Sequence, residues 1–229
     1  MKKADYDVRE ILEFLKDLTA NNNREWFAAN KNRYLRVKDE VETLTQSLLN
    51  RISEFDESAT RLTPSDCLYR IYRDTRFSAD KTPYKNHIGI YINPPYGKKA
   101  PGAGYYLHLE PGNSLVAGGL WCPEAPVLKR VRQDIYENVE EYLEILEDPT
   151  FSKYFGRVGE DLLKTAPKGY PKDWEHIELL RPRNFTAYSP LTERTVCSAR
   201  MEDEVIERMK ALRAFNSFLN FAIDPNREE

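Results

Sequence analysis

The sequence has few of the residues that build metal sites or covalent frameworks. Its 229 residues include only three cysteines and three histidines. The cysteines are far apart and odd in number: Cys67, Cys122 and Cys197. No C-x-x-C pair exists, so neither a zinc ribbon nor a disulfide framework is expected. The histidines lack H-x-H and H-E-x-x-H spacing, which argues against a bound metal. We therefore predict no metal site, and no cofactor can be named from these residues.

The sequence also lacks a long apolar run and an excess of basic residues. No stretch approaches the ~18 apolar residues of a membrane span, and no apolar segment follows the first two lysines, as a secretory signal would require. The formal net charge is −3 and the pI about 5.8, whereas proteins that wrap duplex nucleic acid carry a strong basic excess. We therefore expect a cytoplasmic protein without membrane contact, and nucleic acid is disfavoured as a partner.

Helical periodicity dominates the N-terminal quarter of the chain. Apolar residues recur at helical spacing between Val8 and Leu18, with Asp7 placed to cap that helix. Asn23 is placed to cap a second helix. Its apolar stripe continues from Arg24 to Phe55, which predicts one helix roughly 45 Å long. Residues 56–66 indicate a polar loop.

The middle third has the pattern of an antiparallel meander. Four short runs are β-branched or aromatic and are separated by Pro and Gly: Leu68–Tyr72, His87–Asn93, Gly104–Glu110 and Ser114–Trp121. Two turn signals lie at 94–97 and 110–113, and the second predicts a β-hairpin. Gly118 and Gly119 inside a strand pattern predict a bulge or a close backbone approach.

The remainder returns to helix with a little more sheet. A long helix is expected from Pro126 to about Asp148, ended by Pro149. Strand candidates follow at 177–180 and 185–188, and a closing helix begins after Ser198. We predict a single α+β domain over residues 1–229, in which an antiparallel β meander packs with several long amphipathic helices.

The most site-like stretch runs from Arg70 to Lys85. It carries five cations: Arg70, Arg73, Arg76, Lys81 and Lys85. Guanidinium groups bind carboxylate or phosphate oxygens in a bidentate fork, while lysines add point charge. Tyr72, Phe77 and Tyr84 are placed to stack on a base or sugar ring. Alternatively, Asp74 and Asp80 neutralise the arginines internally, and the segment is a salt-bridged structural loop.

The run R-I-Y-R-D-x-R-F-S-x-D-K-x-P-Y-K in this stretch resembles the signature of a bacterial and fungal family of conserved hypothetical proteins, a domain of unknown function. The resemblance covers nearly the whole chain, with further matches at Asn22–Phe27, Gly104–Pro111, Gly118–Trp121, Pro167–Tyr170 and Leu179–Arg181. It implies a single-domain, bacterial-type protein and brings no known activity, cofactor or catalytic residue. Several residues of the signature are polar, which core packing would not require.

Other candidates for chemistry are weaker. His108 beside Glu110 on one strand face is a candidate acid/base pair, and His87 lies on an adjacent strand. Structural hydrogen bonding is the more common role of such histidines. Asp74 and Asp80 are further weak catalytic candidates. A P-loop, a dinucleotide fingerprint and a nucleophile elbow are all absent.

Our leading hypothesis is a cleft on the sheet that binds a phosphorylated or carboxylated small molecule. Its ligand-binding residues would be Arg70, Tyr72, Arg73, Arg76, Lys81, Tyr84, Lys85 and Tyr106. Phosphoryl or acyl chemistry is the natural class if the protein is an enzyme, with His108 or an aspartate as base. The alternatives are an interaction or scaffold protein, and thirdly a nucleic-acid modifying protein. The ligand, any enzymatic activity and the oligomeric state stay open at this point.

Overall fold

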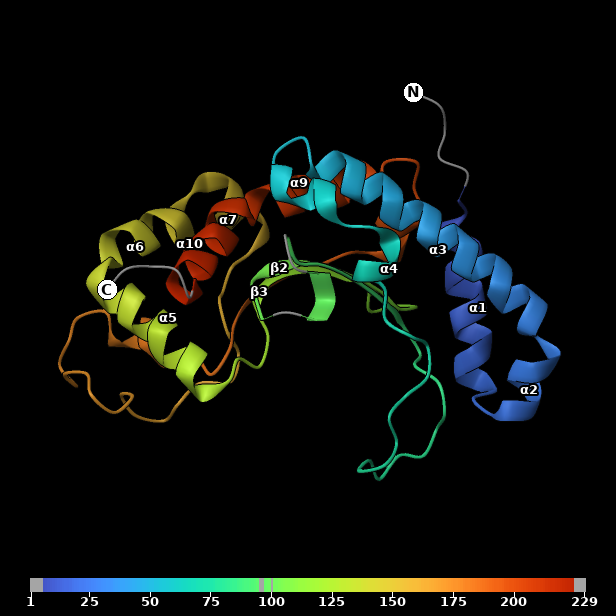
Figure 1. The fold of residues 1–229 in the computed structure, drawn as a ribbon, viewed down its shortest axis with the longest axis horizontal. Coiled ribbons are helices and arrows are strands. Elements are labelled where there is room, and N and C mark those ends of the chain that lie inside the picture. Colours follow the sequence, from blue (N-terminus) through green and yellow to red (C-terminus); the bar gives the residue numbers. More distant parts are fainter. Residues whose placement is uncertain (1–5, 95–96, 100, 225–229) are drawn as a thin grey trace.

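The computed structural model describes residues 6–94, 97–99 and 101–224. They form an α+β fold in which one four-stranded antiparallel sheet packs against helices (Figure 1). The elements are α1 (Val8–Ala20), α2 (Arg24–Ala29), α3 (Lys31–Ile52), α4 (Pro64–Cys67), β1 (Ile88–Ile92), β2 (Gly104–Leu109), β3 (Leu115–Leu120), α5 (Ala125–Glu137), α6 (Val139–Glu147), α7 (Pro149–Tyr154), β4 (Phe185–Pro190), α8 (Glu193–Val196), α9 (Met201–Ala211) and α10 (Arg213–Ile223). Short 3-10 helices lie at Glu57–Arg61, Gly97–Lys99 and Ile177–Leu180.

The sheet confirms the predicted meander. Its strands are ordered β1-β2-β3-β4, and each neighbouring pair is antiparallel. The hairpin between β2 and β3 turns as expected, because Gly112 takes a positive φ of 75° and the N–H of Asn113 donates to the carbonyl of Glu110 at 3.1 Å. This turn chemistry is local, which is why sequence alone could predict it.

The two faces of the sheet differ in what covers them. The inner face carries Tyr105, Leu107 and Val116, all buried, and contacts α9 and α10. In Figure 1 the described α-helices lie over this face or at the ends of the sheet. Tyr106 and His108 alternate with the buried residues of β2, so their side chains lie on the opposite face. We call this second face the outer face.

Gly118 and Gly119 occupy the predicted close backbone approach. A Cβ on Gly119 would lie 2.0 Å from the carbonyl oxygen of Phe185, and its φ of 105° favours glycine. A Cβ on Gly118 would lie 2.7 Å from Leu212 at the junction of α9 and α10. These glycines therefore let β3 pack directly against β4 and the C-terminal helices.

Three of the expected long helices are broken into pairs. The predicted Arg24–Phe55 helix ends at Asn30, whose side-chain Nδ2 donates to the carbonyl of Trp26 at 2.9 Å; α3 then continues to Ile52. The predicted Pro126–Asp148 helix breaks at Asn138, and Pro149 begins α7 as well as ending the preceding stretch. The closing helix divides at Leu212. The apolar stripe continues across each break, so periodicity alone predicted the wrong length.

Three shorter predictions were also wrong. Residues 177–180 form a 3-10 helix instead of a strand, and the expected loop at 56–66 contains the 3-10 helix Glu57–Arg61 and most of α4. The run Leu68–Tyr72 makes only isolated bridges, from Leu68 to Ile90 and from Tyr72 to Tyr84. The predicted turn at 94–97 lies partly outside the described residues. No helix within the described ranges is both long and apolar enough to cross a bilayer.

Candidate functional site

The segment 70–85 leaves the edge of the sheet and returns to it, forming the long excursion below the sheet in Figure 1. Its two arms pair with each other. Tyr72 forms a bridge with Tyr84, and the backbone N–H of Lys85 donates to the carbonyl of Ile71 at 2.8 Å. We call these paired arms the base of the segment. The pairing brings residues that are twelve to fourteen positions apart in the sequence next to each other beside β1.

The loop between α1 and α2 holds the base in place. The side chain of Asn22 acts as a backbone mimic, since its Nδ2 donates to the carbonyl of Tyr84 at 3.0 Å and its Oδ1 accepts from the N–H of Tyr84 at 3.1 Å. The Tyr84 ring is buried and stacks on Phe27 with 4.0 Å between centroids. Tyr84, predicted as a ligand-binding wall, is thus placed as a packing anchor, with Tyr72 45% exposed beside it.

Residues 73–82 form the tip of the segment, and Arg73 is its hub. The Arg73 guanidinium pairs with Asp80 at 2.5 Å and donates to the hydroxyl and the carbonyl of Thr82. Its second nitrogen reaches Ser78 at 3.5 Å. The pKa of Asp80 is lowered, first by the Thr82 N–H and then by the Arg73 guanidinium. Arg73 is therefore committed to partners within its own loop.

The other charged groups of the tip are paired in the same way. Arg76 binds Asp74 through two nitrogens, at 3.0 and 2.6 Å, and lowers the pKa of that carboxyl. The Nζ of Lys81 donates to the carbonyl of Thr75 at 2.9 Å. The side chain of Phe77 takes no part in these ion pairs and hydrogen bonds, and it is 96% exposed. The aspartates thus neutralise two of the three predicted arginines, as the structural alternative requires.

The base lines a cavity of about 350 Å³ between α3 and the edge of the sheet. Its apolar wall consists of Val37, Val41, Leu68, Ile71 and Ile88. Three cations, Lys38, Arg70 and Lys85, and one carboxylate, Glu42, face the same space. Lys38 and Glu42 pair with each other at 2.8 Å along α3. The lining of the cavity is therefore largely apolar and carries more cations than carboxylates.

Arg70 and Lys85 differ from the cations of the tip because neither has a carboxylate of the described residues within ion-pair distance, although the Arg70 charge contributes to lowering the pKa of Asp74. Within the described part of the chain, neither side chain forms a hydrogen bond or an ion pair. The Lys85 Nζ lies 5.2 Å from the ring centroid of Tyr69. Burial lowers the pKa of Lys85, and the neighbouring Arg70 charge lowers it further. A half-buried ammonium beside a second cation is a favourable place for an anion.

Three polar residues form a hydrogen-bonded chain on the outer face next to this cavity. The Tyr106 hydroxyl lies 2.9 Å from His108 Nδ1, and His108 Nε2 lies 3.0 Å from a Glu110 carboxylate oxygen. Asn113 donates to the same oxygen at 2.8 Å, and Asn86 donates to the other. Although burial opposes it, hydrogen bonding to His108 and Asn113 lowers the pKa of Glu110. Burial raises the pKa of Tyr106 to about 12. We call Tyr106, His108 and Glu110 the relay.

His87 connects the cavity to the relay. It lines the cavity, and its ring stacks on His108 with 4.4 Å between centroids. Its Nδ1 lies 3.0 Å from the Asn86 side chain, which also contacts Glu110. Burial lowers the pKa of His87 to about 4, with further contributions from His108 and Lys85. His87 is thus neutral at pH 7.

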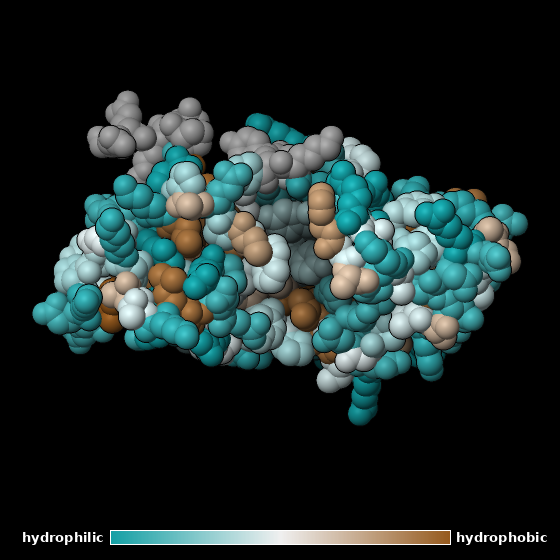
Figure 2. Space-filling view, turned by 90° about the horizontal axis from the view of Figure 1, so that it is seen from below, coloured by the Kyte–Doolittle hydropathy of each residue, from teal (hydrophilic) through white to brown (hydrophobic). Residues whose placement is uncertain are grey.

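Gly89 brings the relay against the cavity wall. It lines the cavity and is paired with His108 in the β1–β2 register. A Cβ on Gly89 would lie 2.7 Å from the Tyr106 hydroxyl oxygen, so the missing side chain leaves room for that hydroxyl. The molecule is hollowed on the side that carries the outer face (Figure 2).

The structure separates the predicted residues into two sets. Arg70 and Lys85 line the cavity, and Tyr106 lies beside it, joined to the weaker candidate His108. The other predicted residues do not line it: Tyr72, Arg73, Asp74, Arg76, Asp80, Lys81 and Tyr84. Sequence reasoning did not select Tyr69 or Gly89, because nothing local shows that they face this space, and it named His87 only as a neighbour of His108 on the adjacent strand. Within the described ranges, no three acidic, Cys or His residues are grouped as a metal site would require.

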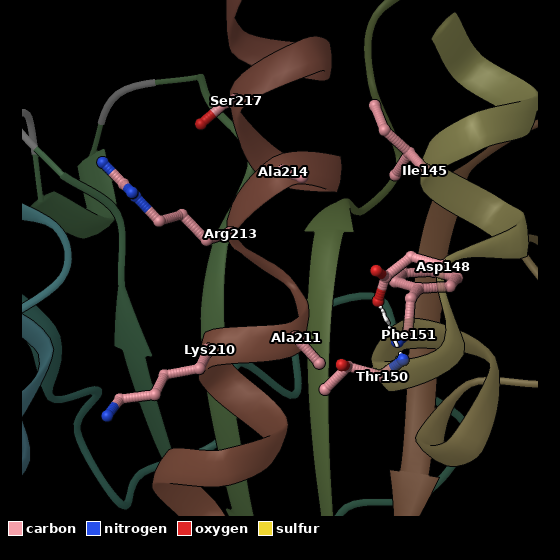
Figure 3. A pocket seen from close by; sticks show the side chains of 9 residues that line it. All are labelled: Ile145, Asp148, Thr150, Phe151, Lys210, Ala211, Arg213, Ala214 and Ser217. Atoms are coloured by element: carbon pink, nitrogen blue, oxygen red, sulfur yellow. Dashed lines mark hydrogen bonds between the residues drawn. The ribbon is translucent and has the colours of Figure 1, made fainter. Parts of the chain in front are cut away.

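A second cavity, of about 460 Å³, lies between α6–α7 and α9–α10 (Figure 3). Asp148 is committed there to capping α7, accepting from the N–H groups of Thr150 and Phe151 at 2.8 and 2.9 Å. Figure 3 shows Lys210 and Arg213 extending away from Asp148. Its polar groups do not converge, so the smaller cavity beside the relay is the better candidate site.

Comparison with known proteins gives one family. The profile of the family described as conserved hypothetical protein (DUF2461) matches residues 10–218, and the chain belongs to that family. No curated protein matches the chain, and no solved structure matches it. The family description carries no activity, so function must be argued from the site.

Proposed function

We propose that this member of the DUF2461 family binds an anionic small molecule, a phosphate or a carboxylate, in the cavity between α3 and β1. Arg70 and Lys85 are the anion-binding groups in this proposal. The observation that carries it is that these two cations line one cavity and that neither forms an ion pair with a described residue. An anion bound there would relieve the mutual repulsion of the two charges and the cost of burying Lys85.

The cavity also supports a ligand with an apolar body. Its volume of about 350 Å³ falls within the range of small-molecule sites, roughly 300–1,000 Å³, which are mostly apolar with a few polar groups. Val37, Val41 and Ile71 contribute to the apolar lining, and the cations Arg70 and Lys85 are close enough to influence each other. We therefore favour a phosphate ester or an organic acid over a fully hydrophilic anion.

We extend this proposal to the cellular compartment and the source of the protein. We place the protein in the bacterial cytoplasm, where phosphorylated and carboxylated metabolites are abundant and thiols stay reduced. The three cysteines, all free, support a reducing compartment, and the resemblance of the sequence to a bacterial and fungal family supports the source.

Isothermal titration calorimetry with inorganic phosphate, acetate, a mononucleotide and an aryl carboxylate tests the site. The decisive variant is Arg70→Met with Lys85→Met, and its matched control is Arg76→Met with Lys81→Met, which removes the same charges from the tip. Each charge-assisted hydrogen bond contributes about 1.5–3 kcal/mol, so the first double variant should lose about 100-fold or more in affinity. The control should stay within about twofold. Equal losses in both variants, or no binding to wild type at millimolar anion, would contradict the proposal.

One observation favours a second candidate function, a protein-interaction role for the tip. Phe77 is 96% exposed at the end of a loop that is already fixed by its own ion pairs. A preorganised loop with an exposed aromatic side chain is typical of a protein contact. Phe77→Ser should then abolish partner capture in a pull-down without changing the calorimetric anion affinity.

A further inference from the structure

The relay has the hydrogen-bond order of a nucleophile, a base and an orienting carboxylate. An ionised carboxylate can only accept, so Glu110 must accept from His108 Nε2–H at 3.0 Å. In a neutral imidazole with this tautomer, His108 Nδ1 carries the lone pair and accepts from the Tyr106 hydroxyl, which lies 2.9 Å away. The Tyr106 proton is thus directed at the lone pair of an imidazole.

The orienting carboxylate is itself fixed. Asn113 and Asn86 each donate to Glu110, and the Glu110 backbone N–H donates to the Ser114 hydroxyl at 3.1 Å. The His108 side chain is 13% exposed and the Glu110 side chain 18%, so water competes little for these hydrogen bonds. A base that is held by a fixed carboxylate is the arrangement by which enzymes activate a hydroxyl nucleophile.

A neighbouring tyrosine provides a contrast within the same protein. Tyr91 lies directly across from Tyr106 in the β1–β2 register and on the same face. Its hydroxyl donates to the carbonyl of Gly102 at 2.7 Å, and a carbonyl oxygen cannot serve as a general base. The two phenols therefore share a fold position and a residue type and differ in their acceptors.

We propose that Tyr106 is a nucleophile for phosphoryl transfer, with His108 as its general base and Glu110 as the group that positions the imidazole. The Tyr106 O–H bond breaks as its proton passes to Nδ1 of His108, and the phenolic oxygen forms a bond to phosphorus. The bond from phosphorus to the leaving oxygen breaks, and that oxygen takes the proton back from Nδ1. Water then cleaves the phosphotyrosine, so the overall reaction is hydrolysis of a phosphate ester.

The proposed substrate class rests on the proposed function, because Arg70 and Lys85 would hold the anionic phosphate beside Gly89. The reactivity of Tyr106 does not depend on those cations. A neutral phosphorylating reagent, diisopropyl fluorophosphate, therefore tests the relay separately from anion binding. Attack by the phenolic oxygen releases fluoride and leaves a phosphorylated tyrosine that peptide mass spectrometry can locate.

Tyr106 should be labelled at least about tenfold faster than Tyr91 in the wild-type protein, since general-base catalysis contributes about 10²–10⁴ in rate. His108→Gln should lower the Tyr106 rate at least about tenfold, Glu110→Gln should lower it by a smaller factor, and His176→Gln should leave it unchanged. Equal labelling of Tyr106 and Tyr91 in the wild-type protein would overturn the proposal, and this comparison requires no variant. A Tyr106 labelling rate that His108→Gln does not change would overturn it as well. Labelling of Tyr106 with no binding of any anion by calorimetry would instead reject the proposed function and leave the relay standing.

Discussion

The tip and the base of the segment 70–85 contain the same residue types in opposite electrostatic states. In the tip, Arg73 and Arg76 are paired with Asp80 and Asp74 inside the loop. In the base, Arg70 and Lys85 line a cavity, and neither forms an ion pair with a described residue. One run of sixteen residues thus holds a salt-bridged structural loop and a candidate anion site.

This difference shows that charge density alone does not identify a binding site. A paired arginine has already satisfied its donors, and recruiting it to a ligand would first break an existing ion pair. Lys85, which is unpaired and partly buried, carries a desolvation cost that a ligand can offset. The two regions thus differ in whether their cations form ion pairs. The substitutions below either add a carboxylate partner to the base or remove an ion pair from the tip.

Among single substitutions, the largest effect should come from giving the base a carboxylate of its own. His87→Glu places an anion beside Lys85 and Arg70, which then resemble the paired arginines of the tip. Loss of charge-assisted hydrogen bonds worth about 2 kcal/mol should weaken anion binding about 30-fold by calorimetry. The neutral His87→Gln variant is the control and should keep most of the affinity. Unchanged affinity in His87→Glu would show that the base does not bind the anion.

A smaller effect should appear in the pH dependence of stability. The pKa of His87 is about 4 in the folded protein, against 6.5 for a free histidine. The unfolded chain therefore binds more protons at His87 between these values, and stability falls as the pH drops from about 6.5 to 4. After a discount for solvent screening, we expect a loss of about 1–2 kcal/mol.

Urea unfolding at pH 7, 5.5 and 4 measures this loss. The difference between wild type and His87→Gln isolates the contribution of His87 from that of the carboxylates. Saturating phosphate should reduce the loss in wild type if an anion binds beside His87. Parallel profiles for the two proteins would rule out the histidine as the source.

Removing the hub of the tip should have a modest effect on stability and little effect on binding. Arg73→Met loses the donors to Asp80, Thr82 and Ser78. A loss of about 1 kcal/mol lowers the melting temperature of a protein of this size by about 2–4 °C. Tryptic cleavage after Arg76 and Lys81 should become faster as the tip opens. An anion affinity that falls as much as in the base variants would make the tip part of the site.

The smallest effect should be that of the most exposed pair. The side chain of Arg76 is 76% exposed, and its partner Asp74 is 45% exposed. Exposed ion pairs of this kind are screened by water and salt, so Arg76→Met should leave the melting temperature within about 1 °C of wild type. A larger shift by differential scanning fluorimetry would show that the tip packs against something more than its own side chains.

Much of the secondary structure followed from local chemistry. The caps at Asp7 and Asn23, the hairpin turn at Gly112 and the alternation along β2 all depend on residues close together in the sequence. The breaks at Asn30 and Asn138 were missed although asparagine was correctly taken as a helix breaker at residues 21–23. At both positions the side-chain amide donates to the carbonyl of the residue four positions earlier, whereas the apolar stripe continues and hides the break.

The sequence by itself determined the α+β fold class, the meander and the segment in which to look for a site. Patterning and turn chemistry are properties of near neighbours, and they act before the chain has folded. Only the tertiary structure decided which cations of that segment are paired, because Arg70 and Lys85 meet a cavity wall supplied by α3. It also decided that Tyr106 meets His108 beside Gly89. The pairs Arg76–Asp74 and His108–Glu110 are close in the sequence, and sequence analysis could name them as candidates. Burial, and the cavity that Arg70 and Lys85 line, depend on α3, which is distant in the sequence, so no local pattern records them.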